Sequence, residues 1–263
     1  AKNGLPKDVL FDLRVGIAFH SLRAVPPEAM VQVLAAVDAT MPVHIHVAEQ
    51  TAEVDECLAL RGARPVQWLL DNADVDQRWT LVHATHLLPT EVAAIARSKA
   101  VVAICTTTEA NLGDGLFPLR DFIAAGGRFG VGSDSNVSVS PVEELRWLEY
   151  GQRLVARQRN IASTDAISST GGSLYLQALR GGLQSCGQAA AVSDRIVVDA
   201  DSVLMAGVTA DDLHDRYVFA GNRPLVRDVY VGERQVVRAG RHPSADAIAR
   251  RYRDTLRKLL ADS

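Results

Sequence analysis

Short apolar runs alternate with longer helical patterns through the first half of the chain, and this alternation is the feature that most restricts the fold. Each run is four or five residues long and is rich in β-branched or aromatic side chains. Runs of this kind, separated by helices, are typical of βα units, which build parallel sheets. Five strands are therefore expected, at residues 15–19, 43–47, 80–83, 101–105 and 129–133.

Prolines and glycines mark the helices between these strands. Pro27, Pro89 and Pro118 stand where helices are expected to begin, because proline is favoured in the first helical turn. A helix over residues 58–70 is expected to be interrupted near Gly62.

The pattern changes after residue 134. Two amphipathic helices are expected over residues 141–158 and 174–183. Alternating β-branched stretches then predict a small antiparallel region with strands at residues 196–198, 216–219 and 228–231. A polar helix over residues 245–260 is expected to follow them.

Composition excludes several classes of partner. A formal net charge of -3 provides no broad basic field for nucleic acid or an anionic membrane surface, so a small-molecule partner is expected. No apolar run reaches the roughly 18 residues of a membrane helix. The 3 cysteines have no C-x-x-C spacing, which argues against a disulfide framework and favours a reducing, cytoplasmic compartment.

Polar side chains stand where the predicted strands end. In parallel α/β architectures, ligands bind outside the carboxyl ends of the strands. Imidazoles and carboxylates gathered there can supply both metal ligands and proton carriers. The candidates are His20, Arg23, His46, Glu49, His83 and Asp134.

His44 and His46 share one face of a predicted strand, because side chains on a strand repeat every two residues. His46 lies about 6.6 Å nearer the loops, so we place it in the site and expect His44 to be a hydrogen-bonded residue of a lower core layer. Glu49 follows just off the strand, where a carboxylate with a raised pKa can carry a proton. The alternative for Glu49 is a helix-start carboxylate favoured by the helix dipole.

The other candidates also have structural alternatives. His83 ends its strand, whereas His86 is expected to face the following helix. Asp134 can ligate a metal, accept a proton, or cap a helix. The planar guanidinium of Arg23 can hold a carboxylate with two hydrogen bonds, and His20 can add one more. The alternative for Arg23 is an ordinary surface arginine in a loop. What indicates a site is their occurrence at consecutive strand ends.

Residues 105–115 are expected to contribute packing and a loop. Residues 106–111, with Gly113 and Gly115, are predicted to form a polar loop that either lines the pocket or turns the chain. Cys105 is expected to be a small buried hydrophobic residue, because no neighbouring motif makes it a nucleophile.

With these residues the chain resembles the amidohydrolase superfamily and, within it, the formimidoylglutamate deiminase family. The resemblance runs through most of residues 13–160. It is carried by residues 19–25, 44–50, 83–86, 107–115, 132–135 and 143–154, of which the segments 107–115 and 143–154 are specific. It implies a (β/α)8 TIM-type barrel, of which this chain holds about the last five βα units, followed by helices and a small β region.

The resemblance also implies a reaction and roles. It implies zinc-dependent hydrolysis of N-formimino-L-glutamate, a small acidic amino-acid derivative, to N-formyl-L-glutamate and ammonia in histidine degradation. The implied roles are metal ligation by His46 and Asp134, proton transfer by Glu49 and Asp134, polarisation of the substrate or orientation of water by His83, and carboxylate binding by His20 and Arg23.

The sequence departs from the family pattern in three places. Thr106 stands where the family usually has Pro, and Asn136 where it usually has His. The family's first-strand His-x-His metal motif should lie well before His20, and no such segment exists here. The pair His44 and His46 has that form, but its place in the chain matches the fifth barrel strand.

The spacing of the strand ends supports the same expectation independently. The units repeat every 28 residues or so, and eight of them would need roughly 230 residues. An open half-barrel exposes unpaired strand edges and an apolar core face. We therefore expect the C-terminal part of a larger barrel, completed by an N-terminal segment, another chain or a homo-oligomer. The expected parts are residues 1–160 (barrel), 161–192 (helical extension) and 193–263 (β region and closing helix).

Two other interpretations stay open at this point. A superfamily deaminase acting on a heterocycle such as a purine is disfavoured by His20 and Arg23, because a neutral ring has no carboxylate to hold. An inactive fragment that needs a partner chain is the second. Two protein ligands without the histidine pair should hold zinc poorly, so stoichiometric zinc would require a supplementary chain.

Overall fold

The computed structural model describes residues 14–188 and 193–261, and its chain divides into two compact units. The first unit is Ala1–Ala190 with Asp211–Phe219, and the second is Ala191–Ala210 with Ala220–Ser263. The division expected at residues 160 and 192 stays a prediction. Residues 1–13 and 189–192, which that division includes, lie outside the described part.

The first unit contains a five-stranded parallel sheet in the order β1-β2-β3-β4-β5, which confirms the predicted βα architecture. Its strands are β1 (Ile17–Ser21), β2 (Val43–Val47), β3 (Trp79–His83), β4 (Val101–Ile104) and β5 (Arg128–Val131). In β2, Val43, Ile45 and Val47 are fully buried, while His44 and His46 lie half-buried on the other face. This two-residue alternation separates the packed face from the face that carries the polar side chains.

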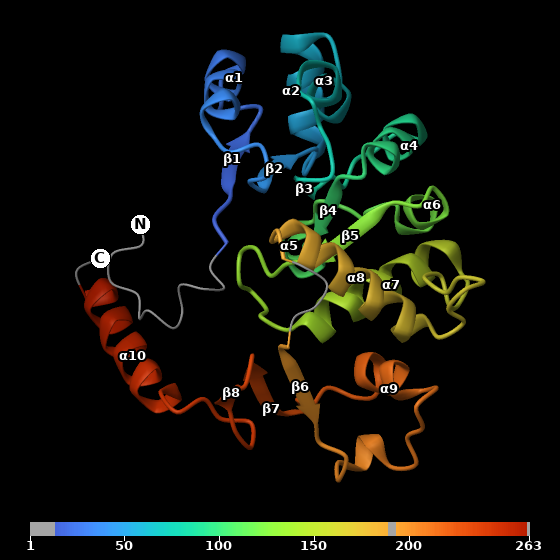
Figure 1. Cartoon of the computed structure of the whole chain (residues 1–263), viewed down its shortest axis with the longest axis vertical. Coiled ribbons are helices and arrows are strands. Elements are labelled where there is room, and N and C mark those ends of the chain that lie inside the picture. Colours follow the sequence, from blue (N-terminus) through green and yellow to red (C-terminus); the bar gives the residue numbers. More distant parts are fainter. Residues whose placement is uncertain (1–13, 189–192, 262–263) are drawn as a thin grey trace. The chain divides into compact units, whose positions relative to one another are not determined.

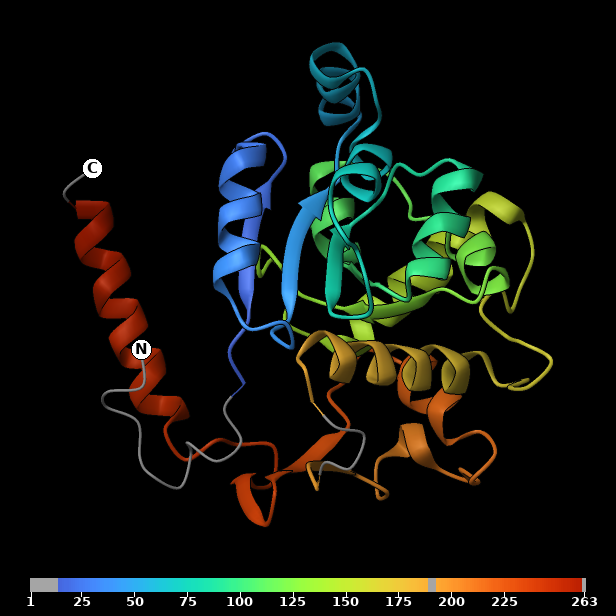
Figure 2. The same cartoon turned by 45° about the horizontal axis from the view of Figure 1, so that its top comes forward.

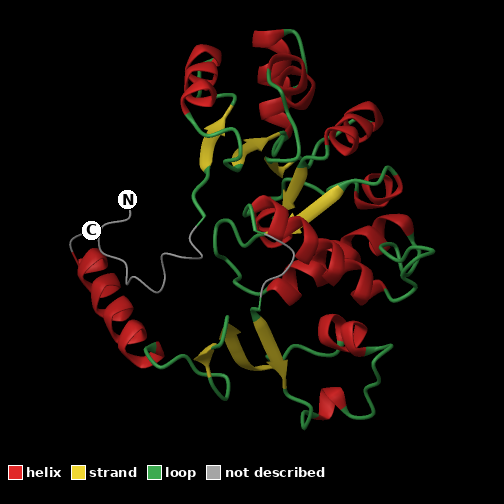
Figure 3. Ribbon diagram, viewed as in Figure 1, coloured by secondary structure: helices red, strands yellow, loops and turns green. Residues whose placement is uncertain are grey.

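Helices follow the strands, and all but the short helix directly after β4 lie outside the sheet (Figures 1 and 3). They are α1 (Pro27–Ala36), α2 (Thr51–Arg61), α3 (Pro65–Asn72), α4 (Pro89–Ser98), α5 (Thr106–Leu112) and α6 (Leu119–Ala124). The break between α2 and α3 occurs where it was predicted. Gly62 has a left-handed φ of 71° and caps α2 by donating its N–H to the carbonyl of Leu58.

Residues 106–112 form a helix, so the prediction of a polar loop over residues 106–111 was wrong. Three β-branched threonines in a row disfavour a helix by propensity. Here Thr106, Thr107 and Thr108 are buried and hydrogen-bonded, and Gly113 ends the helix with a φ of 75°. Tertiary hydrogen bonds therefore outweigh the local preference.

Three further helices complete the first unit: α7 (Pro141–Ala156), α8 (Thr170–Ser185) and α9 (Leu213–Phe219). The strand predicted at residues 216–219 was wrong, because this segment belongs to α9. Val218 belongs to the buried core, and Tyr217 and Phe219 pack against that core from the same helix. Val218 is fully buried, and its carbonyl accepts a hydrogen bond from Arg146 Nε of α7 at 2.8 Å. Packing thus decides against the strand-like composition.

The second unit contains an antiparallel sheet of β6 (Arg195–Val198), β7 (Val226–Val231) and β8 (Arg234–Val237), as predicted for residues 196–198 and 228–231. It also holds the short 3-10 helix Val203–Met205 and the closing helix α10 (Ala245–Ala261), none of whose residues is buried. Over residues 14–188 and 193–261, no helix has the length and apolar character that a bilayer crossing requires.

In the first unit, α8 packs closely against β5 (Figure 2). A Cβ added at Gly181 would lie 1.9 Å from the carbonyl oxygen of Phe129, so helix backbone and strand backbone are in direct contact there. The neighbouring Gly182 has nothing within 4 Å of such a Cβ.

We expect Gly181→Ala to lower the free energy of unfolding by about 1–3 kcal/mol or more, because α8 must move away from β5. Gly182→Ala is the matched control and should be neutral or stabilising by up to about 1 kcal/mol through helix propensity. Urea denaturation followed by circular dichroism measures both. Equal stabilities of the two variants would contradict the contact.

Candidate metal centre

His46 projects from β2 with one ring nitrogen already engaged. Its Nδ1 lies 2.7 Å from the carbonyl oxygen of His20. A carbonyl only accepts, so Nδ1 carries the proton and Nε2 is the nitrogen available to a ligand. The structure therefore fixes both the orientation and the tautomer of His46.

His83 ends β3 in an unusual backbone conformation. Its φ is 68°, and that of Ala84, which follows it, is 48°. Left-handed values are uncommon for residues other than glycine and cost on the order of 1–3 kcal/mol, so they persist only where surrounding contacts enforce them. The ring is buried, with Nδ1 3.3 Å from Glu109 Oε1 and Nε2 3.6 Å from Glu49 Oε1.

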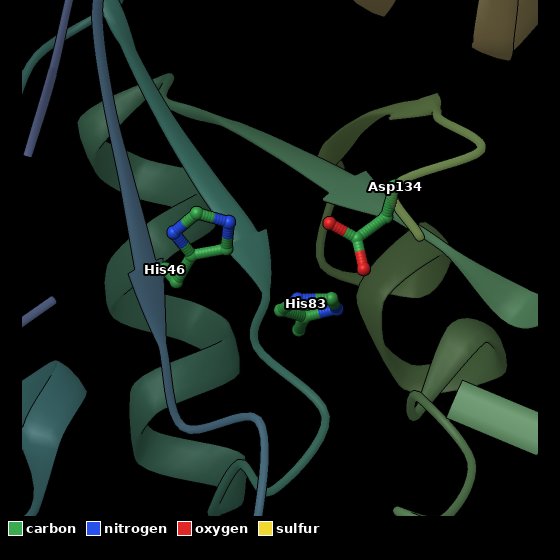
Figure 4. A group of neighbouring side chains, drawn as sticks. All are labelled: His46, His83 and Asp134. Atoms are coloured by element: carbon green, nitrogen blue, oxygen red, sulfur yellow. The ribbon is translucent and has the colours of Figure 1, made fainter. Parts of the chain in front are cut away.

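Asp134 lies in the turn after β5, also with a left-handed φ, of 44°. Its carboxylate is exposed and approaches the two imidazoles. The ligand atoms offered by His46, His83 and Asp134 all lie within 4.8 Å of one another (Figure 4). Two imidazole nitrogens and a carboxylate oxygen form a donor set that zinc accepts, so these residues fit a divalent metal of that type.

Glu49 lies beside this cluster and is held by a residue that the sequence analysis missed. Glu53, in the first turn of α2, is buried and accepts hydrogen bonds from the backbone N–H groups of Ala48 and Glu49 at 3.1 and 2.8 Å. Ala48 has a φ of 52°. The only sequence signal for Glu53 was an acid near a helix start, which is usually a solvated dipole partner.

Burial and neighbouring charges shift the pKa values of Glu49 and His83. Burial is the largest cause of the raised pKa of the Glu49 carboxyl, with Asp114 and Asp134 adding to it and His83 opposing it. Burial alone would lower the pKa of His83. The hydrogen bond that His83 donates to Glu109 and the negative charges of Glu49, Glu109 and Asp134 outweigh it, so the pKa of His83 is raised.

His20 and Arg23 lie at the end of β1. The ring centroids of His20 and His46 are 5.7 Å apart, and the β1–β2 register skips His20, which lies between Phe19 and Ser21. Arg23 is exposed in the turn that follows β1. Among the described residues, its guanidinium forms no ion pair. The structure thus brings the ring of His20 beside that of His46, and Arg23 lies exposed in the turn after β1.

Three residues that the sequence placed outside the site can also be located. His44 Nε2 lies 2.9 Å from the carbonyl oxygen of Ser185, so its ring is hydrogen-bonded away from the cluster. The carbonyl of His86 accepts from Arg64 at 2.7 Å. Cys105 is buried, and burial raises the pKa of its thiol above the usual range, as expected for an unreactive cysteine.

Comparison with known proteins identifies relatives of this chain. Residues 6–176 match the model of the amidohydrolase family. A formimidoylglutamate deiminase of Pseudomonas aeruginosa is 54% identical over 252 residues, covering 94% of this chain and 56% of the relative. A 5-methylthioadenosine/S-adenosylhomocysteine deaminase of Natronomonas pharaonis is 28% identical over 235 residues, covering 86% of this chain and 52% of the relative. The chain thus spans about half the length of these relatives.

Solved structures show the same partial coverage. An amidohydrolase from Brucella melitensis superposes with a TM-score of 0.88 at 43% identity, over 93% of this chain and 55% of that protein. An adenosine deaminase from Xanthomonas campestris with bound zinc superposes with a TM-score of 0.79 at 22% identity, over 92% of this chain and 57% of that protein. At that identity the second match shows a shared fold alone.

We expect His83 in the metal-free protein to titrate above the ordinary value of 6.5, and Glu49→Gln to lower its pKa by removing one nearby charge. A raised histidine pKa stabilises the fold fully below about pH 6.5, and this contribution is lost as the pH rises through the folded-state pKa. NMR titration of the ring measures the pKa. Glu28→Gln, at an exposed position of α1, is the control. A His83 pKa at or below 6.5 would show that burial outweighs the neighbouring carboxylates.

Proposed function

Because this chain belongs to the amidohydrolase family, we propose that it forms the catalytic part of a zinc-dependent iminohydrolase that converts N-formimino-L-glutamate to N-formyl-L-glutamate and ammonia. The observation that carries the proposal is the convergence of His46, His83 and Asp134 within 4.8 Å at the carboxyl ends of one parallel sheet. The 54% identity to a formimidoylglutamate deiminase supports the choice of substrate.

In this proposal His46 and Asp134 hold one zinc ion. His46 offers Nε2, since Nδ1 donates to the carbonyl of His20. Asp134 offers a carboxylate oxygen from the turn after β5. Zinc lowers the pKa of a coordinated water to about 7 and so supplies a hydroxide nucleophile at neutral pH.

Glu49 and Asp134 carry the protons of the hydrolysis. Water adds its oxygen to the formimino carbon, the bond from that carbon to the terminal nitrogen breaks, and both water protons end on the departing ammonia. A carboxylate with a raised pKa exchanges a proton closer to neutral pH than an ordinary one does, and the pKa of Glu49 is raised. Asp134 accepts the second proton and passes it to the departing nitrogen, and His83 directs Nε2 towards the reacting atoms.

His20 and Arg23 bind the acidic end of the substrate. Arg23 forms no ion pair within the described residues, and its guanidinium can hold a carboxylate with two parallel hydrogen bonds. His20 stands next to His46, which places an anion-binding group near the metal. His20 and Arg23 together favour an acidic amidine over a neutral heterocycle as the substrate. Relatives at 28–32% identity nevertheless include 5-methylthioadenosine/S-adenosylhomocysteine deaminases.

The proposal includes a further polypeptide segment that completes the barrel and supplies the remaining metal ligands. In the described residues β1 pairs with β2 alone, so its other edge is open to another strand. The relatives are about twice as long as the matched region. A segment of the same protein is the first choice, and a second copy of this chain is the alternative. Cys57, Cys105 and Cys186 are free thiols, which suits the cytoplasm.

Ammonia release and zinc content, measured together on the full-length protein that contains this chain, test the proposal. We expect one zinc per active site and ammonia from N-formimino-L-glutamate. Glu49→Gln should retain zinc and lose about 10²–10⁴-fold in turnover, because a proton carrier and not a ligand is removed.

Glu56→Gln, an exposed carboxylate of α2, is the control for that experiment and should behave as wild type. Zinc without ammonia would remove this substrate from the proposal. Ammonia from 5-methylthioadenosine instead would support the heterocycle alternative. Full turnover by Glu49→Gln would assign the proton transfer to another group.

Arg23→Ala separates the acidic substrate from neutral ones. Loss of a charged hydrogen bond of about 1.5–3 kcal/mol should raise KM for N-formimino-L-glutamate about 10–100-fold. KM for a neutral formamidine should not change. Steady-state kinetics measures both, with Arg97→Ala, at an exposed position of α4, as the control. Equal losses on both substrates would exclude Arg23 from carboxylate binding.

A further inference from the structure

The first turn of α5 carries two polar side chains that are buried at the carboxyl end of the sheet. Thr108 is 1% exposed and Glu109 is 2% exposed. Buried polar groups are expected to be hydrogen-bonded, and the partners of these two are informative. Each one holds the backbone or ring of a different candidate metal-site residue.

Thr108 holds the turn that contains Asp134. Its hydroxyl donates to the carbonyl of Ser133 at 3.3 Å, and it accepts from the backbone N–H of Ser135 at 3.2 Å. The hydroxyl of Ser135 lies 2.8 Å away and can fill the remaining lone pair. A threonine hydroxyl has one donor and two acceptor sites, so these bonds use its full capacity. These hydrogen bonds fix the backbone on both sides of Asp134.

The hydrogen bonds of Thr108 explain how Asp134 keeps its left-handed backbone. A φ of 44° is unfavourable for aspartate and persists where the surroundings over-determine it. The bonds from Thr108 to Ser133 and Ser135 supply that constraint from a neighbouring element. Without the hydroxyl, the turn can relax to ordinary backbone angles, and the carboxylate would then point elsewhere.

Glu109 holds His83 in a corresponding way. Its Oε1 accepts from the backbone N–H of Cys105 at 3.0 Å and lies 3.3 Å from Nδ1 of His83. An ionised carboxylate only accepts, so Nδ1 carries a proton and Nε2 faces Glu49 and the metal cluster. The tautomer of His83 therefore depends on Glu109, and His83 also has a left-handed φ.

The turn that carries both residues is itself fixed. Glu144 of α7 is buried and accepts from the hydroxyl of Thr106 at 2.8 Å and from the backbone N–H of Thr107 at 3.0 Å. The hydroxyl of Thr107 bonds to the same carboxylate. A shift of α5 would break several hydrogen bonds to the buried carboxylate of Glu144. The first turn of α5 is therefore held in place and can position the residues that contact it.

We propose that the first turn of α5 is the positioning element of the metal site, with Thr108 setting the direction of the Asp134 carboxylate and Glu109 setting the orientation and tautomer of His83. Neither residue contacts the metal or the substrate. The proposal rests on the proposed function in one respect, namely that a metal binds at this cluster. Groups that orient metal ligands typically contribute 10–100-fold to metal affinity.

Metal titration of the full-length protein tests the role of Thr108. The dissociation constant for Co²⁺ and Zn²⁺ is measured by competition with a chromophoric chelator. We expect Thr108→Val, which keeps the shape and loses the hydroxyl, to bind metal about 10–100-fold more weakly. Thr108→Ser retains the hydroxyl and should restore the affinity to within a few-fold of wild type.

Thr80→Val is the matched control. Thr80 is a fully buried threonine of β3 whose hydroxyl has no partner among the described side chains, so its loss should leave metal affinity unchanged. Melting temperatures of the metal-free variants separate positioning from stability, since a merely structural Thr108 would lower the melting temperature without weakening metal binding by the folded protein. Ser135→Ala, at an exposed position, provides a second variant that removes one bond to Thr108 and should also weaken metal binding.

Glu109→Leu tests the second half of the proposal by removing the acceptor of His83. Nitrogen-15 NMR of the metal-free protein should show His83 changing from the Nδ1–H tautomer to a mixture, while His46 keeps its Nδ1–H form. An unchanged His83 tautomer would overturn the role of Glu109. Wild-type metal affinity in both Thr108→Val and Ser135→Ala would overturn the role of Thr108 and leave the proposed function standing. A wild-type protein that binds no metal would overturn both.

Discussion

Buried glutamates that accept backbone N–H groups are the interaction on which the rest of this structure depends. Where a parallel strand ends, the chain turns away and its N–H groups leave the sheet ladder, so they need acceptors that water cannot supply inside the protein. A carboxylate is a strong acceptor for this purpose and costs little when several donors surround it. The chain uses this arrangement after several strands, with Glu53 at Ala48 and Glu49, Glu91 at Leu88, Glu109 at Cys105 and Glu144 at Thr107. Glu149 accepts in the same way from Ile161 and Ala162 in the loop after α7.

The strands were predictable because their signal is local. The segment 43–47 alternates buried and half-buried side chains, and the structure gives the strand the same bounds. Helices whose formation depends on contacts distant in sequence were not predictable. Residues 216–219 have strand-like composition and fold as α9 against α7, and residues 106–112 form a helix because Glu144, more than thirty residues later, accepts bonds from Thr106 and Thr107.

The sequence also predicted which side chains gather at the sheet end, since the carboxyl ends of parallel strands share one edge. His46, His83 and Asp134 converge for that reason. The residues that orient them were missed. Thr108 and Glu109 resemble ordinary helix-start residues in sequence, and their partners lie on other strand ends. The backbone angles of His83 and Asp134 have no sequence signature either, because only glycine marks a left-handed position reliably.

The anchoring of the strand-end loops has an evolutionary consequence. Glu53 secures the segment after β2, and Glu109 and Glu144 secure the segment after β4, through different carboxylates on different helices. A replacement in the segment after β2 therefore leaves the carboxylates that secure the segment after β4 intact, whereas a change in the first turn of α5 would also disturb the end of β3 and the turn after β5. New specificities can arise in the segment after β2 while the rest of the scaffold keeps its geometry, so a chain of this design can diversify its chemistry without first losing its fold.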